Sequence, residues 1–231
     1  MRLLAWNIRQ GGGSRLARIA AALEQHAADI LVLSEYRGGE ASRRLRAALE
    51  ILGYRHQTAL APPAGRSGVL IAARCSFRDH GAVGGCLPEP YRMIGAVFPA
   101  FRLVGIYMPN LLAKMPYWEE LIKTMRESGA PALAVGDFNT CRPYLDEEGA
   151  IDRTAFYMDR IAEIGFCDLW SRRNPELREY SWFSTRGNGF RIDHAFLSDA
   201  LAAQAGPIRY SHEERLAGLS DHSPLILDLP I

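Results

Sequence analysis

Six short groups of polar residues stand at the ends of apolar runs, and together they hold the side chains that could do chemistry. Five groups follow an apolar run and one precedes it: Trp6-Asn7, Ser34-Glu35, Tyr107-Met108-Pro109-Asn110, Gly136-Asp137-Phe138-Asn139 and Ser220-Asp221-His222, and then Arg191-Ile192-Asp193. Any one of them alone is more often an ordinary turn, because Asn and Asp are common turn residues. Polar strand ends from distant parts of one sheet system converge on a common rim, so the six together predict one site.

The side chains expected at this rim are mostly oxygen donors. They are Asn7, Glu35, Asp137, Asn139, Asp193, Asp221 and His222. Carboxylate and amide oxygens without thiolates favour a hard cation, Mg²⁺ or Mn²⁺. One histidine beside several acids adds a group that can titrate near neutral pH. The set therefore predicts a divalent-metal site with an acid–base group next to it.

The elements that must position these residues follow from the apolar pattern. Strands are expected at 3–8, 29–33, 55–59, 68–73, 77–83, 93–98, 103–108, 132–135, 180–183, 192–197, 207–210 and 225–229. Helices are expected after Ser14 as N-cap, at 41–52 with Gly53 ending it, at 117–127 and at 153–164. Two mainly antiparallel sheets packed face to face, with helices on the outer faces, would bury these runs. The predicted fold class is a four-layer α/β sandwich.

Composition sets the broad class of the protein. The chain has 231 residues, of which 48% are apolar, and a formal net charge of +1. These values predict one domain over 1–231 with a sizeable core, and the charge argues neither for nor against nucleic acid. Four cysteines without a C-x-x-C pair argue against a zinc knuckle and predict reduced thiols. The sequence shows no signal peptide or membrane span, so a cytoplasmic location without a membrane partner is expected.

The six groups also occur in the order in which a known family carries them. Written as WN, E, YxPN, GDFN, RID and SDHSP, they resemble the motifs of the endonuclease/exonuclease/phosphatase superfamily, with its DNase I-like fold and its exonuclease III-type abasic-site endonucleases. The resemblance runs from Leu3 to about Leu229, and GDFN followed at a distance by SDH is specific to it. It implies a DNase I-like sandwich and a divalent-metal-dependent phosphoesterase.

The resemblance implies a role for each acidic and amide residue near the metal. Glu35 would be the main metal ligand, with Asn7 beside it and Asp221 near the metal. Asp137 would orient or deprotonate the attacking water. Asn139 would donate a hydrogen bond to a phosphoryl oxygen, where charge builds up during hydrolysis.

Other motif residues would act on the phosphate and its leaving group. By the same resemblance, Tyr107 and Asn110 would contact the scissile phosphate. His222 would serve as acid/base or phosphate ligand, with Asp193 accepting its other ring N–H. A carboxylate behind an imidazole fixes its tautomer and raises its basicity.

Further residues are expected at the substrate. Arg142 follows GDFNT and Arg191 opens RID, and both are predicted to bind substrate, with an ordinary surface ion pair as the alternative for Arg191. Trp182, Phe183 and Phe190 could stack on a base. The alternative is that Trp182 and Phe183 alternate along a strand, which would place at least one of them in the core.

Two positions depart from the common abasic-endonuclease pattern. Arg9 stands two residues after Asn7, where related enzymes often carry an acid, so it could disfavour a second metal or contact phosphate instead. Ser34 replaces the usual Gln before Glu35, and its hydroxyl could still hydrogen-bond the carboxylate.

The leading functional hypothesis is an endonuclease or exonuclease that hydrolyses DNA phosphodiester bonds with Mg²⁺ or Mn²⁺, with DNA as substrate and no protein partner implied. The first alternative is a phosphatase or phosphodiesterase acting on a small molecule or a lipid headgroup, because the same catalytic groups serve both. The second is a non-catalytic binding domain, and the presence of all the motif residues argues against it.

Overall fold

Two six-stranded sheets form the centre of the structure, a computed structural model that describes residues 1–129, 131–149 and 152–230. The first sheet has, in spatial order, β13 (Ile208–Tyr210), β14 (Leu225–Asp228), β1 (Arg2–Asn7), β2 (Ile30–Arg37), β4 (Ser67–Ala73) and β3 (His56–Thr58). The second has β5 (Arg78–Ala82), β6 (Met93–Val97), β7 (Arg102–Tyr107), β8 (Ala132–Asp137), β12 (Asp193–Ser198) and β9 (Phe166–Asp168). A separate hairpin pairs β10 (Trp182–Phe183) with β11 (Gly189–Phe190).

Each sheet has one parallel pair at its centre, and its other pairs are antiparallel. The parallel pairs are β1 with β2 and β7 with β8. Each is joined by a crossover helix, α1 (Leu16–His26) in the first sheet and α3 (Met115–Arg126) in the second. The carboxyl ends of these four strands therefore come to one end of the sandwich. The prediction of mainly antiparallel sheets is confirmed.

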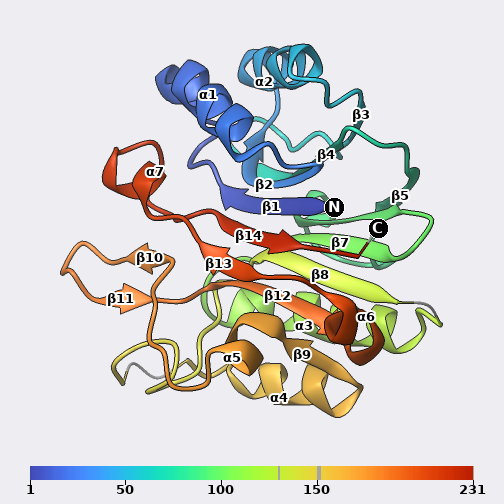
Figure 1. Ribbon diagram of the computed structural model, residues 1–231, viewed down its shortest axis with the longest axis vertical. Helices are drawn as coiled ribbons and strands as arrows, with labels where there is room; N and C mark the ends of the chain where they lie inside the picture. The colour runs from blue at the N-terminus through green and yellow to red at the C-terminus, as the bar shows by residue number, and fades with distance from the viewer. Residues whose placement is uncertain (130, 150–151, 231) are drawn as a thin grey trace.

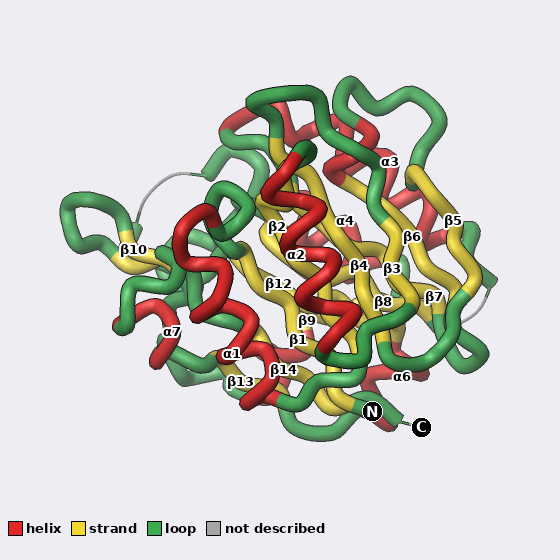
Figure 2. Tube along the Cα trace, turned by 90° about the horizontal axis from the view of Figure 1, so that it is seen from above, coloured by secondary structure: helices red, strands yellow, loops and turns green. Residues whose placement is uncertain are grey.

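Helices cover the outer face of each sheet, which completes four layers (Figure 1). α1 and α2 (Glu40–Ile51) lie over the first sheet, as Figure 2 shows from above. α3 and α4 (Phe156–Glu163) pack on the second. The remaining helices are short: η1 (Gly13–Arg15), η2 (Pro90–Arg92), η3 (Leu111–Lys114), α5 (Leu169–Arg173), α6 (Asp199–Gln204) and α7 (Glu213–Leu216).

The central strands are apolar along their whole length because both of their faces are buried. In β1, Leu3 and Ala5 point into the core between the sheets, whereas Leu4 and Trp6 pack under the helices on the first sheet. This alternation over two cores explains why the sequence shows continuous apolar runs there. The four-layer sandwich is confirmed.

The structure also corrects some expected elements. Ser14 does not cap α1: it lies inside η1, and the N-cap of α1 is Arg15, without a side-chain hydrogen bond. Gly53 does end α2, with a φ of +93° that suits glycine. The helix expected at 153–164 begins only at Phe156. β9 and the short helices were not predicted, because three to six residues carry too little periodicity.

Candidate active site

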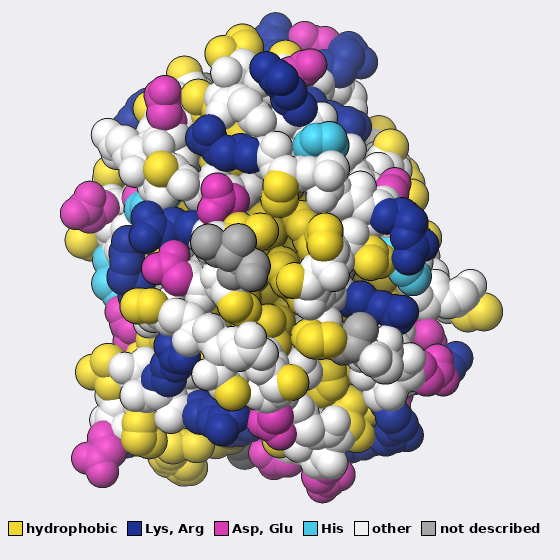
Figure 3. Space-filling view, turned by 45° about the vertical axis from the view of Figure 1, so that its right-hand side comes forward, with side chains coloured by type: hydrophobic (Ala, Val, Ile, Leu, Met, Phe, Trp, Pro, Cys, Tyr) yellow, Lys and Arg dark blue, Asp and Glu magenta, His cyan; other side chains and the backbone are white. Residues whose placement is uncertain are grey.

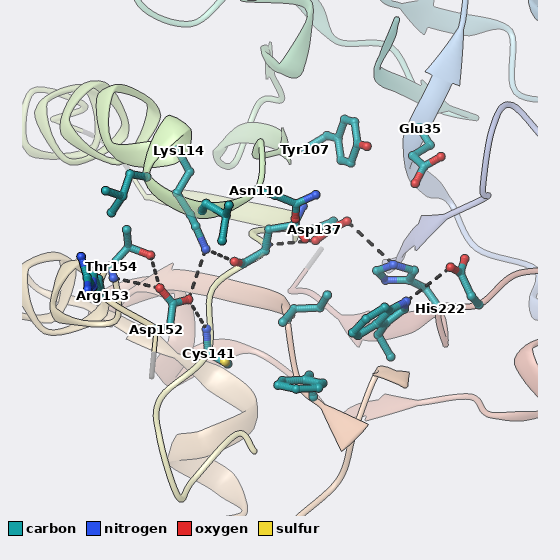
Figure 4. Close-up of a pocket in the computed structure, with 17 residues that line it drawn as sticks. Glu35, Tyr107, Asn110, Lys114, Asp137, Cys141, Asp152, Arg153, Thr154 and His222 are labelled. Carbon is teal, nitrogen blue, oxygen red and sulfur yellow. Dashed lines mark hydrogen bonds and ion pairs between the residues drawn. The ribbon is translucent and has the colours of Figure 1, made fainter. Parts of the chain in front are cut away.

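A pocket of about 760 Å³ opens at the end of the sandwich where the central strands finish (Figure 4). Seven of the predicted site residues line it: Glu35, Tyr107, Asn110, Asp137, Asn139, Asp221 and His222. Asn7 and Asp193 lie directly behind it, bonded to Asp137 and His222. The sheet register produces this convergence, because Asp137 is paired with Tyr107 on one side and with Asp193 on the other.

Asp137 is the buried centre of the site, with 2% of its surface exposed. Its Oδ2 accepts a hydrogen bond from Asn7 Nδ2 at 2.9 Å, and its Oδ1 accepts one from the Asn139 backbone N–H at 3.0 Å. Burial raises the pKa of Asp137, and the positive charge of His222 opposes that rise. A carboxylate with a raised pKa in a pocket is suited to accept a proton.

His222 and Asp193 form a hydrogen-bonded pair next to Asp137. His222 Nδ1 lies 2.8 Å from Asp193 Oδ2, and His222 Nε2 lies 4.0 Å from Asp137 Oδ2. Burial would lower the pKa of His222, but the charges of Asp193 and Asp137 outweigh it and raise that pKa. The bond to Asp193 leaves Nε2 free to carry a proton toward the pocket.

Glu35 lies at a β-bulge in β2, where the pairing with β4 shifts between Ser34 and Tyr36. Its φ is +58°, a left-handed conformation that is costly for a residue with a side chain. Glu35 Oε2 accepts the Gln10 N–H at 2.7 Å, and Oε1 accepts Asn7 Nδ2 at 3.2 Å. Ser34 Oγ bonds the carbonyl of Ile106 instead of Glu35, so that expected hydroxyl–carboxylate contact is wrong.

Asn7 links the two sheets at the site. Its Nδ2 donates to Glu35 and to Asp137, and its Oδ1 accepts the Arg9 N–H at 2.9 Å. The side chain therefore orients the two carboxylates. That Asn7 also binds a metal stays a prediction.

The GDFN segment is shaped by close backbone approach. A Cβ at Gly136 would collide with the carbonyl of Ile106, so only glycine fits there. Asn139 has a φ of +47°, and its Nδ2 donates to the Met108 carbonyl at 2.7 Å. The second proton of that amide remains available to a ligand in the pocket.

Lys114 is a site residue that the sequence analysis did not identify. It lines the pocket although it is only 2% exposed, and its Nζ bonds the carbonyl of Asn139 and lies 3.2 Å from Asp152 Oδ2. The contact holds Asn139 in its left-handed conformation. A signal was present, since Lys114 is one of only two lysines in a chain otherwise rich in arginine.

The two arginines predicted to bind substrate do not line the pocket. Arg142 Nη2 donates to the Met158 carbonyl at 3.2 Å and lies 3.5 Å from Asp159 Oδ1, next to a different surface hollow. Arg191 is 1% exposed and bonds Asp168 at 2.8 Å. The prediction that Arg191 contacts the substrate is wrong, because its guanidinium is buried and neutralises buried acids. The alternative of a surface ion pair fails for the same reason.

Aromatic side chains form one wall of the pocket. Trp182 and Phe190 line it with ring centroids 5.6 Å apart, and Trp182 Nε1 donates to Asp221 Oδ2 at 3.3 Å. Phe183 is exposed outside it, with the guanidinium of Arg215 over its ring. Neither Trp182 nor Phe183 is in the core, so the core alternative is wrong.

Tyr107 and Asn110 meet the pocket from the segment after β7. Burial, together with the negative charges of Glu35 and Asp137, raises the pKa of Tyr107 to about 12. Its hydroxyl therefore keeps its proton and can donate to a bound anion. Asn110 is exposed at the pocket edge.

The donor set fits a hard divalent cation. The described residues include one buried group of two acids and a histidine, Asp137, Asp193 and His222, whose ligand atoms lie within 4.8 Å of one another. Asp193 and His222 are already hydrogen-bonded to each other, whereas the Glu35 carboxylate faces the pocket from the other side (Figure 4). The one sulfur on the pocket wall, Cys141, is not a thiolate, because burial raises its pKa to about 12.

Comparison with known proteins gives matches over nearly the whole chain. Residues 4–222 match the endonuclease/exonuclease/phosphatase family. The recombination repair protein 1 of Drosophila melanogaster is 25% identical over 76% of this chain, and the match spans about 29% of that protein's length.

Three solved structures have the same fold, and each alignment covers 100% of this chain and 100% of the matched chain. An AP endonuclease from Archaeoglobus fulgidus has a TM-score of 0.87 at 22% identity. A 3′ phosphatase from Neisseria bound to a product DNA hairpin has a TM-score of 0.86 at 23% identity, and a 3′-5′ exonuclease from Neisseria meningitidis has a TM-score of 0.87 at 24% identity. These similarities confirm the expected DNase I-like fold.

Proposed function

This chain belongs to the endonuclease/exonuclease/phosphatase family, and from that premise we propose that it is a divalent-metal-dependent phosphodiesterase that cleaves DNA as one catalytic unit. The observation that carries the proposal is the buried arrangement of Asp137, His222 and Asp193 at the base of a pocket that Glu35 also faces. The chemistry of these groups is that of phosphate ester hydrolysis.

In the proposed reaction the scissile phosphate lies in the pocket in front of Asp137 and His222, within reach of both side chains. Asp137, held by Asn7, accepts a proton from the attacking water. His222 carries a proton on Nε2 toward the phosphate or the departing oxygen, since Asp193 holds Nδ1. Asn139 and Tyr107 donate hydrogen bonds to phosphoryl oxygens, where charge builds up.

Glu35 and Asp221 would hold the metal, with Asn7 beside Glu35. A bound Mg²⁺ or Mn²⁺ supplies positive charge that stabilises phosphoryl and leaving-group oxygens. The strained backbone of Glu35 and the amide of Asn7 fix the direction of the Glu35 carboxylate before any ion binds. Arg9, two residues after Asn7, would disfavour a second metal or contact phosphate instead.

DNA is the proposed substrate because two kinds of observation agree. The relatives include an AP endonuclease and a 3′ phosphatase bound to a product DNA hairpin. Trp182 and Phe190 present aromatic surface inside the pocket, where a base or sugar could pack.

Among the described helices, none has the length and apolar character that a membrane span requires.

A small-molecule phosphodiester is the second candidate. The net charge is only +1, and on the face in Figure 3 Lys and Arg are interspersed with Asp and Glu instead of forming one basic band. A nucleic-acid enzyme depends more on such bands than an enzyme for small diesters does.

Cleavage assays separate the two candidates. Supercoiled plasmid, an abasic duplex and a chromogenic phosphodiester are each incubated with Mg²⁺, Mn²⁺ or EDTA. We expect metal-dependent cleavage of both DNA substrates, with a KM that rises steeply between about 50 and 200 mM salt through counterion release. Cleavage of the chromogenic diester alone would select the second candidate, and no cleavage of any substrate would contradict the proposed function.

The pH dependence of kcat/KM should be bell-shaped. Activity requires ionised Asp137 and protonated His222, and the site raises both pKa values, so both limbs should lie above the ordinary range of the free side chain. Asp193→Asn removes the negative charge that keeps His222 protonated, so the alkaline limb should move to lower pH. An alkaline limb that does not move would contradict the assigned role of Asp193.

A further inference from the structure

The pocket continues beyond the catalytic residues into a second region, which we call the distal arm. Its wall is formed by Leu111, Leu112, Lys114, Cys141, Asp152 and Arg153. In Figure 4 Lys114, Asp152 and Arg153 lie at one end of the pocket and Glu35 and His222 at the other, with Asp137 between them. No step of the proposed hydrolysis uses Arg153.

The one carboxylate of the distal arm is already engaged. Asp152 accepts hydrogen bonds from Lys114 Nζ at 3.2 Å, from the Thr154 N–H at 2.8 Å and hydroxyl at 2.6 Å, and from the Cys141 N–H at 3.3 Å. Burial would raise the pKa of Asp152, but these bonds and the charge of Lys114 lower it. The Asp152 and Lys114 charges therefore offset each other.

Arg153 keeps an unneutralised charge. It is exposed at the pocket wall and has no hydrogen-bond or ion-pair partner in the described part of the chain. By contrast, Arg160 and Arg142 on the same side of the molecule are held by Glu119 at 2.6 Å and Asp159 at 3.5 Å. A free guanidinium beside a paired lysine and aspartate leaves the distal arm with a net positive charge that suits a phosphate.

The distal arm also presents apolar surface. Leu111 and Leu112 are 81% and 50% exposed where they line it. The whole pocket, at about 760 Å³, lies in the range that encloses a drug-sized ligand, whereas one phosphate with its sugar fills only part of that volume. Apolar contact next to a free cation suits a sugar or base followed by its phosphate.

We propose that the distal arm binds the nucleotide adjacent to the scissile phosphate, and that Arg153 pairs with the next phosphate of the same strand. The inference rests on the proposed function and narrows it. The substrate is a polynucleotide that presents at least two successive phosphates, and an isolated nucleotide ester lacks the group that Arg153 recognises.

The test is a thermodynamic cycle between Arg153 and single phosphates of a DNA strand. The probes are a fluorescent abasic duplex and two copies in which one neutral methylphosphonate replaces the phosphate on the 5′ or on the 3′ side of the scissile one. Binding is measured by anisotropy in EDTA, so that no probe is cleaved, for the wild type, Arg153→Gln and Arg209→Gln. Arg209 is a matched control because it is an exposed arginine of β13 outside the pocket.

We expect Arg153→Gln to weaken binding of the unmodified probe about tenfold and Arg209→Gln to weaken it far less. One of the two methylphosphonates should weaken wild-type binding by a similar factor and have no further effect on Arg153→Gln. Additive effects of both changes, or equal effects of the two arginine variants, would overturn the inference.

Cleavage of the same probes with Mg²⁺ keeps the two proposals apart. Coupling between Arg153 and one phosphate without cleavage would leave the subsite standing and reject the nuclease. Cleavage without coupling would keep the nuclease and reject the subsite. Melting temperatures of both arginine variants equal to that of the wild type establish that the comparison is between folded proteins.

Discussion

Asp137→Asn should lower kcat for metal-dependent DNA cleavage by on the order of 10³ while leaving the protein folded. The substitution keeps the shape of the side chain but removes the group that accepts the proton of the attacking water. Asn7 and Asn139 still surround the position, so a ligand phosphate should bind with a similar KM. The measurement is kcat and KM on the abasic duplex with Mg²⁺.

The stability of this variant separates a catalytic role from a structural one. Burial raises the folded pKa of Asp137, so ionised Asp137 costs stability at neutral pH, and that cost increases as the pH rises above the unfolded value. The Asn variant removes this cost. Its side-chain NH₂ group, however, would face another donor, either Asn7 Nδ2 or the Asn139 N–H, so that one hydrogen bond is lost. The two effects oppose each other, so the melting temperature should change by only a few degrees.

Asp159→Asn is the matched control, because Asp159 is an exposed acid that faces Arg142 outside the pocket. It should retain full activity. An Asp137→Asn variant that cleaves DNA at the wild-type rate would reject Asp137 as the proton acceptor. A variant that loses activity and also melts far below the wild type would show that Asp137 serves mainly to hold the fold.

The sequence predicted the convergence of the site because strand ends follow directly from apolar runs. Asn7, Tyr107 and Asp137 each end an apolar run that is buried on both faces. Once the runs are assigned to two sheets packed face to face, these three residues are expected to meet at one edge. The carboxyl ends of the two parallel pairs supply most of the pocket floor. Motif order then added Asp193, at the start of β12, and His222, just before β14.

What the sequence could not predict depends on contacts between distant segments. The bulge that gives Glu35 its positive φ arises from pairing with β4, about thirty residues later. Nothing in the sequence around Lys114 indicates that η3 brings its Nζ to the carbonyl of Asn139. The sequence suggested Arg191 as a substrate contact because an arginine beside a catalytic motif can bind phosphate. Only the fold shows that Asp146 and Asp168, 45 and 23 positions earlier in the chain, bind its guanidinium.

Arg191→Met should destabilise the protein by roughly 3–5 kcal/mol, because it leaves buried acids without their counter-charge. Arg191 is 1% exposed, donates to Asp168 Oδ2 at 2.8 Å, contacts the Asp146 carboxylate, and lies 3.0 Å from His194 Nδ1. For a chain of this size the melting temperature should fall by about 10 °C. The measurement is thermal unfolding at neutral pH, together with kcat and KM below the transition.

The pH dependence of this loss follows from Asp168. Burial would raise its folded pKa, but Arg191 and His194 hold it far below the ordinary value, so wild-type Asp168 contributes stability that is lost as the pH falls. Without Arg191 that pKa should rise, and protonation should then relieve the buried charge, so the difference between the two proteins should narrow in acid. The double variant Arg191→Met/Asp168→Asn should be more stable than Arg191→Met alone for the same reason. An Arg191→Met variant with wild-type stability and a raised KM would instead restore Arg191 as a substrate contact, which its burial argues against.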